Sequence, residues 1–209
     1  MIVAICAGGP VIEAAFSLTP DKWIGVDRGA LYLIDHDIIP DAIVGDFDSV
    51  TAEEFARISQ TVKHIEQFQA EKDETDTDLA LQRALLYKPS EIYLTGVTGG
   101  RLDHYEAALR SLYMMQLQHP TILYKIINPH NEICFLLPGE HVLAKGEYTY
   151  VSFFAYGNTL HEVTLRGVKY ETTDEVIEQG TSRFTSNEII TDGSISFKGD
   201  ICLMIKSKD

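Results

Sequence analysis

The apolar residues of the first part of the chain fall in short β-branched runs, and stretches with helical spacing separate these runs. The spacing predicts helices over Asp76–Tyr87 and Leu102–Gln118. The β-branched runs predict strands at Ile2–Cys6, Trp23–Val26, Ala42–Val44, Val62–Phe68, Glu91–Thr95 and Thr121–Ile127. Such alternation is typical of a mostly parallel sheet with helices on both faces, so we predict a Rossmann-like α/β domain over residues 1–130.

The pattern changes after about Pro138, where helical spacing nearly disappears. Alternating apolar and polar residues predict strands at Tyr148–Phe154, Glu162–Leu165 and Ser194–Phe197. Pairs of turn residues recur at Pro138-Gly139, Lys145-Gly146, Gly157-Asn158, Arg166-Gly167, Gln179-Gly180, Asp192-Gly193 and Gly199-Asp200. This texture predicts a C-terminal antiparallel β-sandwich over residues 131–209.

Polar and glycine-rich motifs follow the strands of the predicted parallel sheet. Gly8-Gly9 follows the first strand and Asp27-Arg28-Gly29 the second, while acidic clusters follow the next three. In open parallel sheets, ligands bind in the crevice beyond the carboxyl ends of the strands. We therefore expect these motifs to contribute to one site.

Two of the acidic clusters suit a cation with oxygen ligands. Asp46 and Asp48 begin a loop after a strand, and Asp73 and Asp76 lie three residues apart before a helix. The structural alternatives are a turn for the first pair and helix capping by Asp73 or Thr75 for the second. Carboxylates this dense repel one another without a cation, so the acidic set predicts a divalent metal such as Mg²⁺; the set is Asp46, Asp48, Asp73, Asp76 and Asp103. Asp78, in the same run, is expected to face solvent.

The segment Thr98-Gly99-Gly100-Arg101-Leu102-Asp103-His104 is a glycine-rich turn from strand to helix. Backbone N–H groups at such a turn bind anions, and an arginine beside them can hold phosphate through paired donors. The segment matches neither a Walker A loop nor a dinucleotide fingerprint. A plain glycine turn is the alternative, and His104 fits a structural helix residue equally well. Asp27-Arg28-Gly29 is the weakest candidate, because an ordinary turn explains most of it.

Composition limits the partners. The formal net charge of −14 argues against nucleic acid, which is bound by excess Lys and Arg. No apolar run approaches the roughly 20 residues that span a bilayer, and the first residues resemble a strand more than a signal peptide. Cys6, Cys134 and Cys202 lie far apart in apolar contexts, which predicts buried thiols in a reducing compartment. We expect a cytoplasmic protein with no membrane or nucleic-acid partner.

Taken in order, four segments resemble thiamine pyrophosphokinases of the bacterial type, and the ordered set is far more specific than any one motif. The match runs over nearly the whole chain. The segments are Gly45-Asp46-Phe47-Asp48-Ser49, Lys72-Asp73-x-Thr75-Asp76, Gly99-Gly100-Arg101-x-Asp103-His104, and Gly167-x-Lys169-Tyr170 followed by Thr185-Ser186-Asn187.

The resemblance implies transfer of diphosphate from ATP to the hydroxyl of thiamine, which yields AMP and thiamine diphosphate. It implies an α/β domain for ATP and Mg²⁺, a β-sandwich for thiamine, and a homodimer with active sites at the subunit interface. Eukaryotic members place a tryptophan against thiamine near the last strand, where this chain reads Asp200-Ile201-Cys202-Leu203.

Residue roles follow from the same resemblance. Mg²⁺ would be held by Asp46, Asp48 and Asp76, with Asp73 and Arg101 as further catalytic residues. The nucleotide would be bound by Asp27, Arg28, Gly29, Thr98, Gly99, Gly100, Arg101, Asp103 and His104. Thiamine would be contacted by Thr185, Ser186 and Asn187.

Three other functions fit parts of the sequence. A haloacid-dehalogenase-like phosphatase would use Asp46 as a nucleophile. In such phosphatases the motif follows the first strand of the sheet, whereas in this chain it follows the third. A pyrophosphokinase acting on a pterin shares the nucleotide chemistry and gives no reason for Thr185-Ser186-Asn187. A non-enzymatic module would bind Mg²⁺ and nucleotide without turnover.

Overall fold

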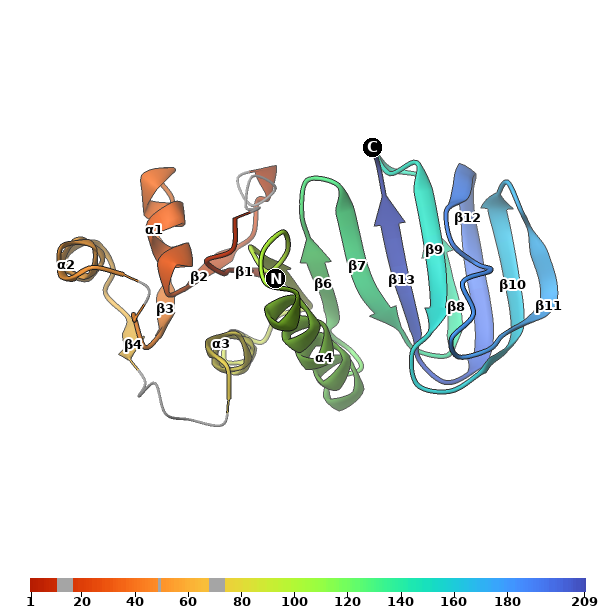
Figure 1. Cartoon of the computed structure of the whole chain (residues 1–209), viewed down its shortest axis with the longest axis horizontal. Helices are drawn as coiled ribbons and strands as arrows, with labels where there is room; N and C mark the ends of the chain where they lie inside the picture. The colour runs from red at the N-terminus through yellow and green to blue at the C-terminus, as the bar shows by residue number, and fades with distance from the viewer. Residues whose placement is uncertain (11–16, 49, 68–73) are drawn as a thin grey trace. The chain divides into compact units, whose positions relative to one another are not determined.

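The computed structural model describes residues 1–10, 17–48, 50–67 and 74–209. Its contacts divide the chain into two compact units, Met1–Pro129 and His130–Asp209. The N-terminal unit contains a sheet whose strands lie in the spatial order β6-β5-β1-β2-β3-β4, all parallel (Figure 1). These strands are β1 (Ile2–Cys6), β2 (Lys22–Val26), β3 (Ala42–Gly45), β4 (Ile65–Gln67), β5 (Glu91–Thr95) and β6 (Leu123–Ile127).

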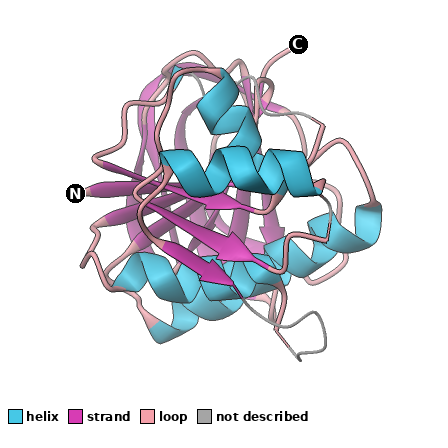
Figure 2. Cartoon of the chain, turned by 90° about the vertical axis from the view of Figure 1, so that its left-hand side faces the viewer, coloured by secondary structure: helices cyan, strands magenta, loops and turns pink. Residues whose placement is uncertain are grey.

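Four helices connect the strands from β2 onward and cover both faces of this sheet (Figure 2). They are α1 (Arg28–Asp35), α2 (Ala52–Thr61), α3 (Asp76–Leu85) and α4 (Leu102–Gln118). Helix α1 packs with α2, and α3 packs with α4. The chain builds the sheet outward from β1 to β4 and then returns to the other side of β1 as β5. Because crossovers between parallel strands are right-handed, this reversal moves the later helices to the opposite face.

The central strands are apolar on both sides, as expected for a covered parallel sheet. Val3, Ala4 and Ile5 are fully buried in β1. Trp23 packs in the core beside Leu33. No helix in the described part of the chain is long and apolar enough to cross a membrane.

The C-terminal unit is built from antiparallel strands in the order β11-β10-β12-β9-β13-β7, and β8 also pairs with β12. The strands are β7 (Asn131–Leu136), β8 (Gly139–Leu143), β9 (Tyr150–Ala155), β10 (Leu160–Val168), β11 (Thr172–Ile177), β12 (Asn187–Gly199) and β13 (Cys202–Ser207). The predicted fold class, a parallel α/β sheet followed by an antiparallel β region, is confirmed.

Two predicted turns are wrong, because Arg166-Gly167 lies inside β10 and Asp192-Gly193 inside β12. Gly167 has φ +76°, and the register between the two strands shifts beside it. A side chain at Gly193 would lie 1.9 Å from the carbonyl oxygen of Arg166. The two glycines therefore mark a β-bulge at which the backbones approach closely. A bulge of this kind needs glycine for the same reason that a turn does, so the sequence pattern is the same.

Several boundaries also differ from prediction, among them those of β4 and α3. The strand predicted over Val62–Phe68 is shorter, since Val62 caps the end of α2 and β4 covers only Ile65–Gln67; Phe68 lies outside the described residues. The helix predicted to reach Tyr87 ends at Leu85. Leu102–Gln118 is helical over the predicted range.

All three cysteines are buried, as predicted. Burial raises the pKa of Cys6 to about 12 and raises that of Cys202 as well. We expect the folded protein to resist a thiol-specific disulfide reagent at pH 8, since the thiolate is the reactive form, and to react at three thiols once unfolded in denaturant. Rapid reaction of Cys6 or Cys202 before unfolding would contradict this.

Candidate active site

A cavity of about 560 Å³ opens in the N-terminal unit beyond the carboxyl ends of its strands. Residues after β1, β2, β3 and β5 line it, together with the first turns of α3 and α4. The strand order reverses between β1 and β5, so the loops after these two strands diverge and leave a crevice. The predicted location of the site at this edge of the sheet agrees with the cavity.

Three carboxylates converge at this cavity. One oxygen each from Asp27, Asp46 and Asp76 lies within 4.8 Å of the others, and all three residues are half-buried. They come from three elements: the end of β2, the end of β3 and the first residue of α3. Burial and the charges of Asp76 and Asp46 raise the pKa of Asp27 to about 6. Three hard oxygen donors that repel one another suit a small divalent cation such as Mg²⁺.

Phe47 explains how the loop after β3 presents its aspartates. Its ring is buried in the core between α1 and α2 and packs edge-on against Phe55 at 4.9 Å. Its backbone N–H donates to Oδ1 of Asp27 at 3.1 Å. Phe47 has φ +62°, a conformation that bulky residues avoid and that its packing maintains. Anchoring this residue leaves Asp46 and Asp48 free to project on either side of it.

Asp27 is held in a strained backbone conformation of its own, with φ +46° and ψ −119°. Its N–H donates to the carbonyl oxygen of Val44 at 3.1 Å, which ties the residue to β3. Sparsely populated backbone conformations persist where the surroundings impose them, and they concentrate at functional sites. Asp27, which the sequence suggested was part of an ordinary turn, thus lines the cavity.

We expect Asp27→Asn to raise the Tm of the metal-free protein by about 2–4 °C, because the change removes a charge that Asp46 and Asp76 repel. The asparagine oxygen can still accept from Phe47. The same variant should show a smaller rise in Tm when Mg²⁺ is added. Thermal unfolding in EDTA and in Mg²⁺ measures both effects, and Asp48→Asn, which removes a carboxylate outside the converging group, serves as a comparison. An undiminished response to Mg²⁺ would argue against Asp27 as a ligand.

Most of the residues predicted from sequence line the cavity: Asp27, Arg28, Asp46, Asp48, Asp76, Thr98, Gly100, Arg101 and His104. Gly29, Gly99 and Asp103 do not line it. Asp48 is exposed and lies outside the group of three converging carboxylates, where Asp27 stands instead. The predicted catalytic residue Asp73 lies outside the described residues.

Several lining residues had no predicted role, although Gly8-Gly9 was expected to contribute to the site. Gly9 donates its N–H to the carbonyl oxygen of Gly96 at 2.7 Å, and a Cβ at Gly9 would lie 2.2 Å from that oxygen. Its position after β1 was the available signal. Ala107 and Ala108 on α4 also line the cavity. Small residues on a helix usually indicate only close packing, so no sequence signal separated them.

Arg101 precedes α4 and donates from Nε and Nη2 to the two carboxylate oxygens of Asp103, at 3.1 and 2.5 Å. This pair holds the pKa of Asp103 at about 2. Both side chains are exposed, so an incoming phosphate can compete for Arg101 at the rim of the cavity. The N-cap residue Arg101 makes no side-chain cap hydrogen bond, while the N–H of His104 donates to Oδ1 of Asp103 at 3.0 Å. An anion that displaces Asp103 would meet N–H groups at this helix end.

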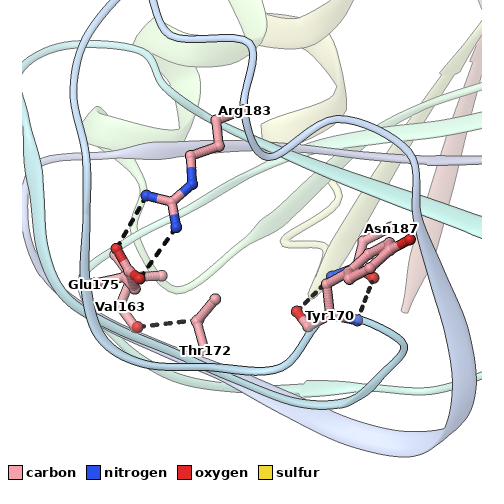
Figure 3. A network of polar contacts seen from close by, with 6 residues as sticks. All are labelled: Val163, Tyr170, Thr172, Glu175, Arg183 and Asn187. Carbon is pink, nitrogen blue, oxygen red and sulfur yellow. Dashed lines mark hydrogen bonds and ion pairs between the residues drawn. The ribbon is translucent and has the colours of Figure 1, made fainter.

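The predicted thiamine-contacting residues Thr185, Ser186 and Asn187 lie in the C-terminal unit, and Figure 3 shows Asn187 with its partner Tyr170. Asn187 is buried, and its side-chain amide pairs with the backbone of Tyr170: it accepts from the N–H at 3.0 Å and donates to the carbonyl oxygen at 2.9 Å. The ring of Tyr170 is exposed. Ser186 has φ +56° and donates its N–H to the hydroxyl of Ser152. The hydroxyl of Thr185 donates to the carbonyl oxygen of Ser182 at 2.7 Å.

A forked ion pair fixes the segment before Asn187. Both terminal nitrogens of Arg183 meet the carboxylate of Glu175 on β11, at 3.2 and 3.1 Å (Figure 3). The segment 178–187 is therefore ordered by polar contacts with β9 and β11 and with the turn at Tyr170. These contacts give Asn187 a structural role that the motif alone did not reveal.

Comparison with known proteins agrees with this geometry. Residues 18–124 match the model described as thiamin pyrophosphokinase, catalytic domain, and residues 140–202 match that of its vitamin B1 binding domain. The chain belongs to the thiamin pyrophosphokinase family. It is 39% identical to thiamine pyrophosphokinase of Bacillus subtilis (strain 168) across 99% of both chains.

Solved structures of this family have the same fold. A thiamine pyrophosphokinase structure from Bacillus subtilis superposes with a TM-score of 0.92 at 38% identity and full coverage of both chains. A thiamin pyrophosphokinase family protein from Enterococcus faecalis gives a TM-score of 0.87 at 35% identity, covering 100% of this chain and 99% of the other. The predicted enzyme class, thiamine diphosphokinase, is confirmed, and the phosphatase, pterin and non-enzymatic alternatives are set aside.

Proposed function

We propose that this thiamine pyrophosphokinase binds ATP with Mg²⁺ in the N-terminal cavity, with Asp27, Asp46 and Asp76 as ligands of the metal. The convergence of these three carboxylates beside a glycine-rich anion site carries the proposal. Asp48 would contribute at the rim of the cavity, through bound water or a second ion. Asp73, adjacent to the same site in sequence, keeps its predicted supporting role.

The reaction needs charge neutralisation and in-line alignment more than covalent help. The thiamine hydroxyl attacks the β-phosphorus of ATP, its oxygen forms the new bond, and the bond from the β-phosphorus to the oxygen of the departing AMP breaks. Mg²⁺ supplies charge neutralisation at the phosphate oxygens when bound. The N–H groups at the start of α4 hold the phosphates. Arg101 releases Asp103 and binds the phosphate oxygens on which negative charge develops in the transition state. Asp73 and Asp76 are the candidates to accept the hydroxyl proton.

We assign the thiamine-binding surface to the C-terminal unit, around Thr185 and Ser186. The amide of Asn187 is occupied by the Tyr170 backbone, so Asn187 would act there by fixing this turn. A homodimer with active sites at the subunit interface remains our prediction from the resemblance, and a cytoplasmic location remains our prediction from composition. Analytical ultracentrifugation tests the first.

The decisive experiment incubates the protein with ATP and thiamine, with and without Mg²⁺, and identifies the nucleotide product. Thiamine-dependent formation of AMP and thiamine diphosphate that is lost without Mg²⁺ supports the proposal, whereas equal AMP formation without Mg²⁺ would overturn it. ADP would indicate transfer of a single phosphoryl group. Release of phosphate without thiamine, combined with a beryllium fluoride adduct on Asp46, would indicate a phosphatase. Binding of nucleotide without any product would indicate a non-catalytic module.

A further inference from the structure

Asp78 makes more contacts than its predicted place on the solvent side of α3 would allow. One carboxylate oxygen accepts from the N–H and hydroxyl of Thr75, at 3.0 and 2.7 Å, and the Thr75 hydroxyl in turn accepts from the N–H of Asp78. This is a capping box that closes the first turn of α3. The other carboxylate oxygen accepts a short hydrogen bond from the hydroxyl of Ser111 on α4. Asp78 therefore joins two helices as well as capping one.

A second contact repeats this connection one turn further along both helices. The side-chain amide of Gln82 on α3 meets the sulfur of Met115 on α4 at 3.8 Å. Gln82 follows Asp78 by four residues, and Met115 follows Ser111 by four. The two helices therefore run side by side in the same direction, and Asp78–Ser111 is the contact nearer to their N-termini.

This contact lies directly behind the wall of the cavity. Residues 74–77 at the start of α3 and Ala107 and Ala108 of α4 line the cavity. The Ser111 hydroxyl also lies 3.0 Å from the carbonyl oxygen of Ala107. The first turn of α3, which begins with Asp76, is thus fastened to the part of α4 that forms the neighbouring wall.

Apolar packing does not supply the same anchor. The buried residues of α3 are Ala80, Leu81 and Ala84, all beyond its first turn. Asp76, Thr77 and Asp78, which begin the helix, are polar and half-buried. A helix end with few buried apolar contacts opens more easily than the rest of the helix, so polar contacts decide how well its side chains are placed.

We propose that Asp78 and Ser111 form a positioning pair that holds the carboxylate of Asp76 in place for the metal ion. The pair touches neither metal nor substrate; it acts through the first turn of α3. The inference rests on the proposed role of Asp76 as a ligand. Residues that orient metal ligands through hydrogen bonds typically change metal affinity 10- to 100-fold when removed.

Three variants separate this role from helix capping. Ser111→Ala removes the connection to α4 and leaves the capping box intact. Asp78→Asn removes the charge and keeps the connection, because its oxygen can accept from Thr75 and its amide nitrogen can donate to Ser111. Ser59→Ala is the matched control, since the Ser59 hydroxyl on α2 donates only to the carbonyl oxygen four residues earlier, at 2.8 Å.

The readout is binding of Mn²⁺, a substitute for Mg²⁺, measured by the electron paramagnetic resonance signal of the free ion, without nucleotide and without turnover. We expect Ser111→Ala to weaken Mn²⁺ binding about 10-fold, Asp78→Asn about 2-fold at most, and Ser59→Ala not at all. Thermal unfolding of each variant accompanies the titrations. Wild-type Mn²⁺ affinity in Ser111→Ala, or an equal loss in Ser59→Ala, overturns the proposal.

Asp76→Asn distinguishes failure of this inference from failure of the metal assignment. If Asp76→Asn binds Mn²⁺ as tightly as the wild type, Asp76 is not a ligand and the basis of the inference is removed. If Asp76→Asn loses binding while Ser111→Ala retains it, the metal assignment stands and the positioning role is wrong. Loss in both variants, with Asp78→Asn close to the wild type, supports positioning.

Discussion

Asp46→Asn is expected to lower kcat by about 10²- to 10³-fold at saturating Mg²⁺, the scale on which loss of one charge-stabilising group acts. Asp46 is the member of the converging group that comes from β3, and asparagine has nearly the same shape. Its oxygen can still accept the N–H of Asp48, as Oδ1 of Asp46 does at 3.0 Å. The loop should therefore keep its conformation, and the loss should reflect the missing charge.

Asp48→Asn is the internal comparison for this prediction. Asp48 is exposed and lies outside the converging group, so we expect a loss of about 10-fold or less. The measurement is formation of AMP over a series of Mg²⁺ concentrations, with Tm recorded for both variants. Wild-type turnover in Asp46→Asn would rule out the proposed metal site. Equal losses in the two variants would restore the metal set inferred from sequence, in which Asp48 is a ligand.

The fold was predictable where local periodicity and burial agree. Leu102–Gln118 has apolar residues at helical spacing and is helical throughout. The apolar runs Ile2–Cys6 and Glu91–Thr95 are central strands of the sheet. The C-terminal unit was less predictable, because glycines such as Gly167 serve a bulge as readily as a turn. Only the partner strand decides between the two.

The site was predictable as a location more than as a list of ligands. Strand ends carry the motifs, and parallel strands bring their carboxyl ends together, so Asp46 and Asp76 were foreseeable neighbours. Asp27 was undervalued because an aspartate two residues before a glycine resembles a turn, and the direction of its side chain depends on a strained backbone that sequence does not show. Asn187 and Asp78 have motif-like positions in the sequence. The residues that bond to their side chains from other elements, Tyr170 and Ser111, are distant in the chain.

These cases share one physical cause. A motif specifies which functional groups are present, whereas packing around it specifies where they point. Phe47 illustrates this, since its burial between α1 and α2 determines which sides of the loop the flanking aspartates occupy. Residues that control orientation are therefore the ones for which sequence and structure give different answers.

Gly45→Ala is expected to lower the rate of AMP formation at least about 100-fold, because the added methyl group displaces the carboxylate of Asp27 from the acidic cluster. A Cβ at Gly45 would lie 1.8 Å from Oδ1 and 2.7 Å from Cγ of Asp27, and the residue has φ +156°. The nearest atom is the end of a side chain, so the fold can adjust by rotating Asp27 away. That rotation breaks its bond with the Phe47 N–H and removes one carboxylate from the converging group.

Gly139→Ala is a matched control, since Gly139 has φ +142° and nothing within 4 Å of the added Cβ. Both variants should lose stability from backbone strain, on the order of 1–3 kcal/mol, but only Gly45→Ala should lose Mg²⁺ binding and AMP formation. Adding Asp27→Gly to Gly45→Ala relieves the clash, so Tm should recover in part while activity stays low. Recovery of activity in that double variant would show that the cluster works without Asp27, and that Gly45→Ala acts only through its clash with the Asp27 side chain.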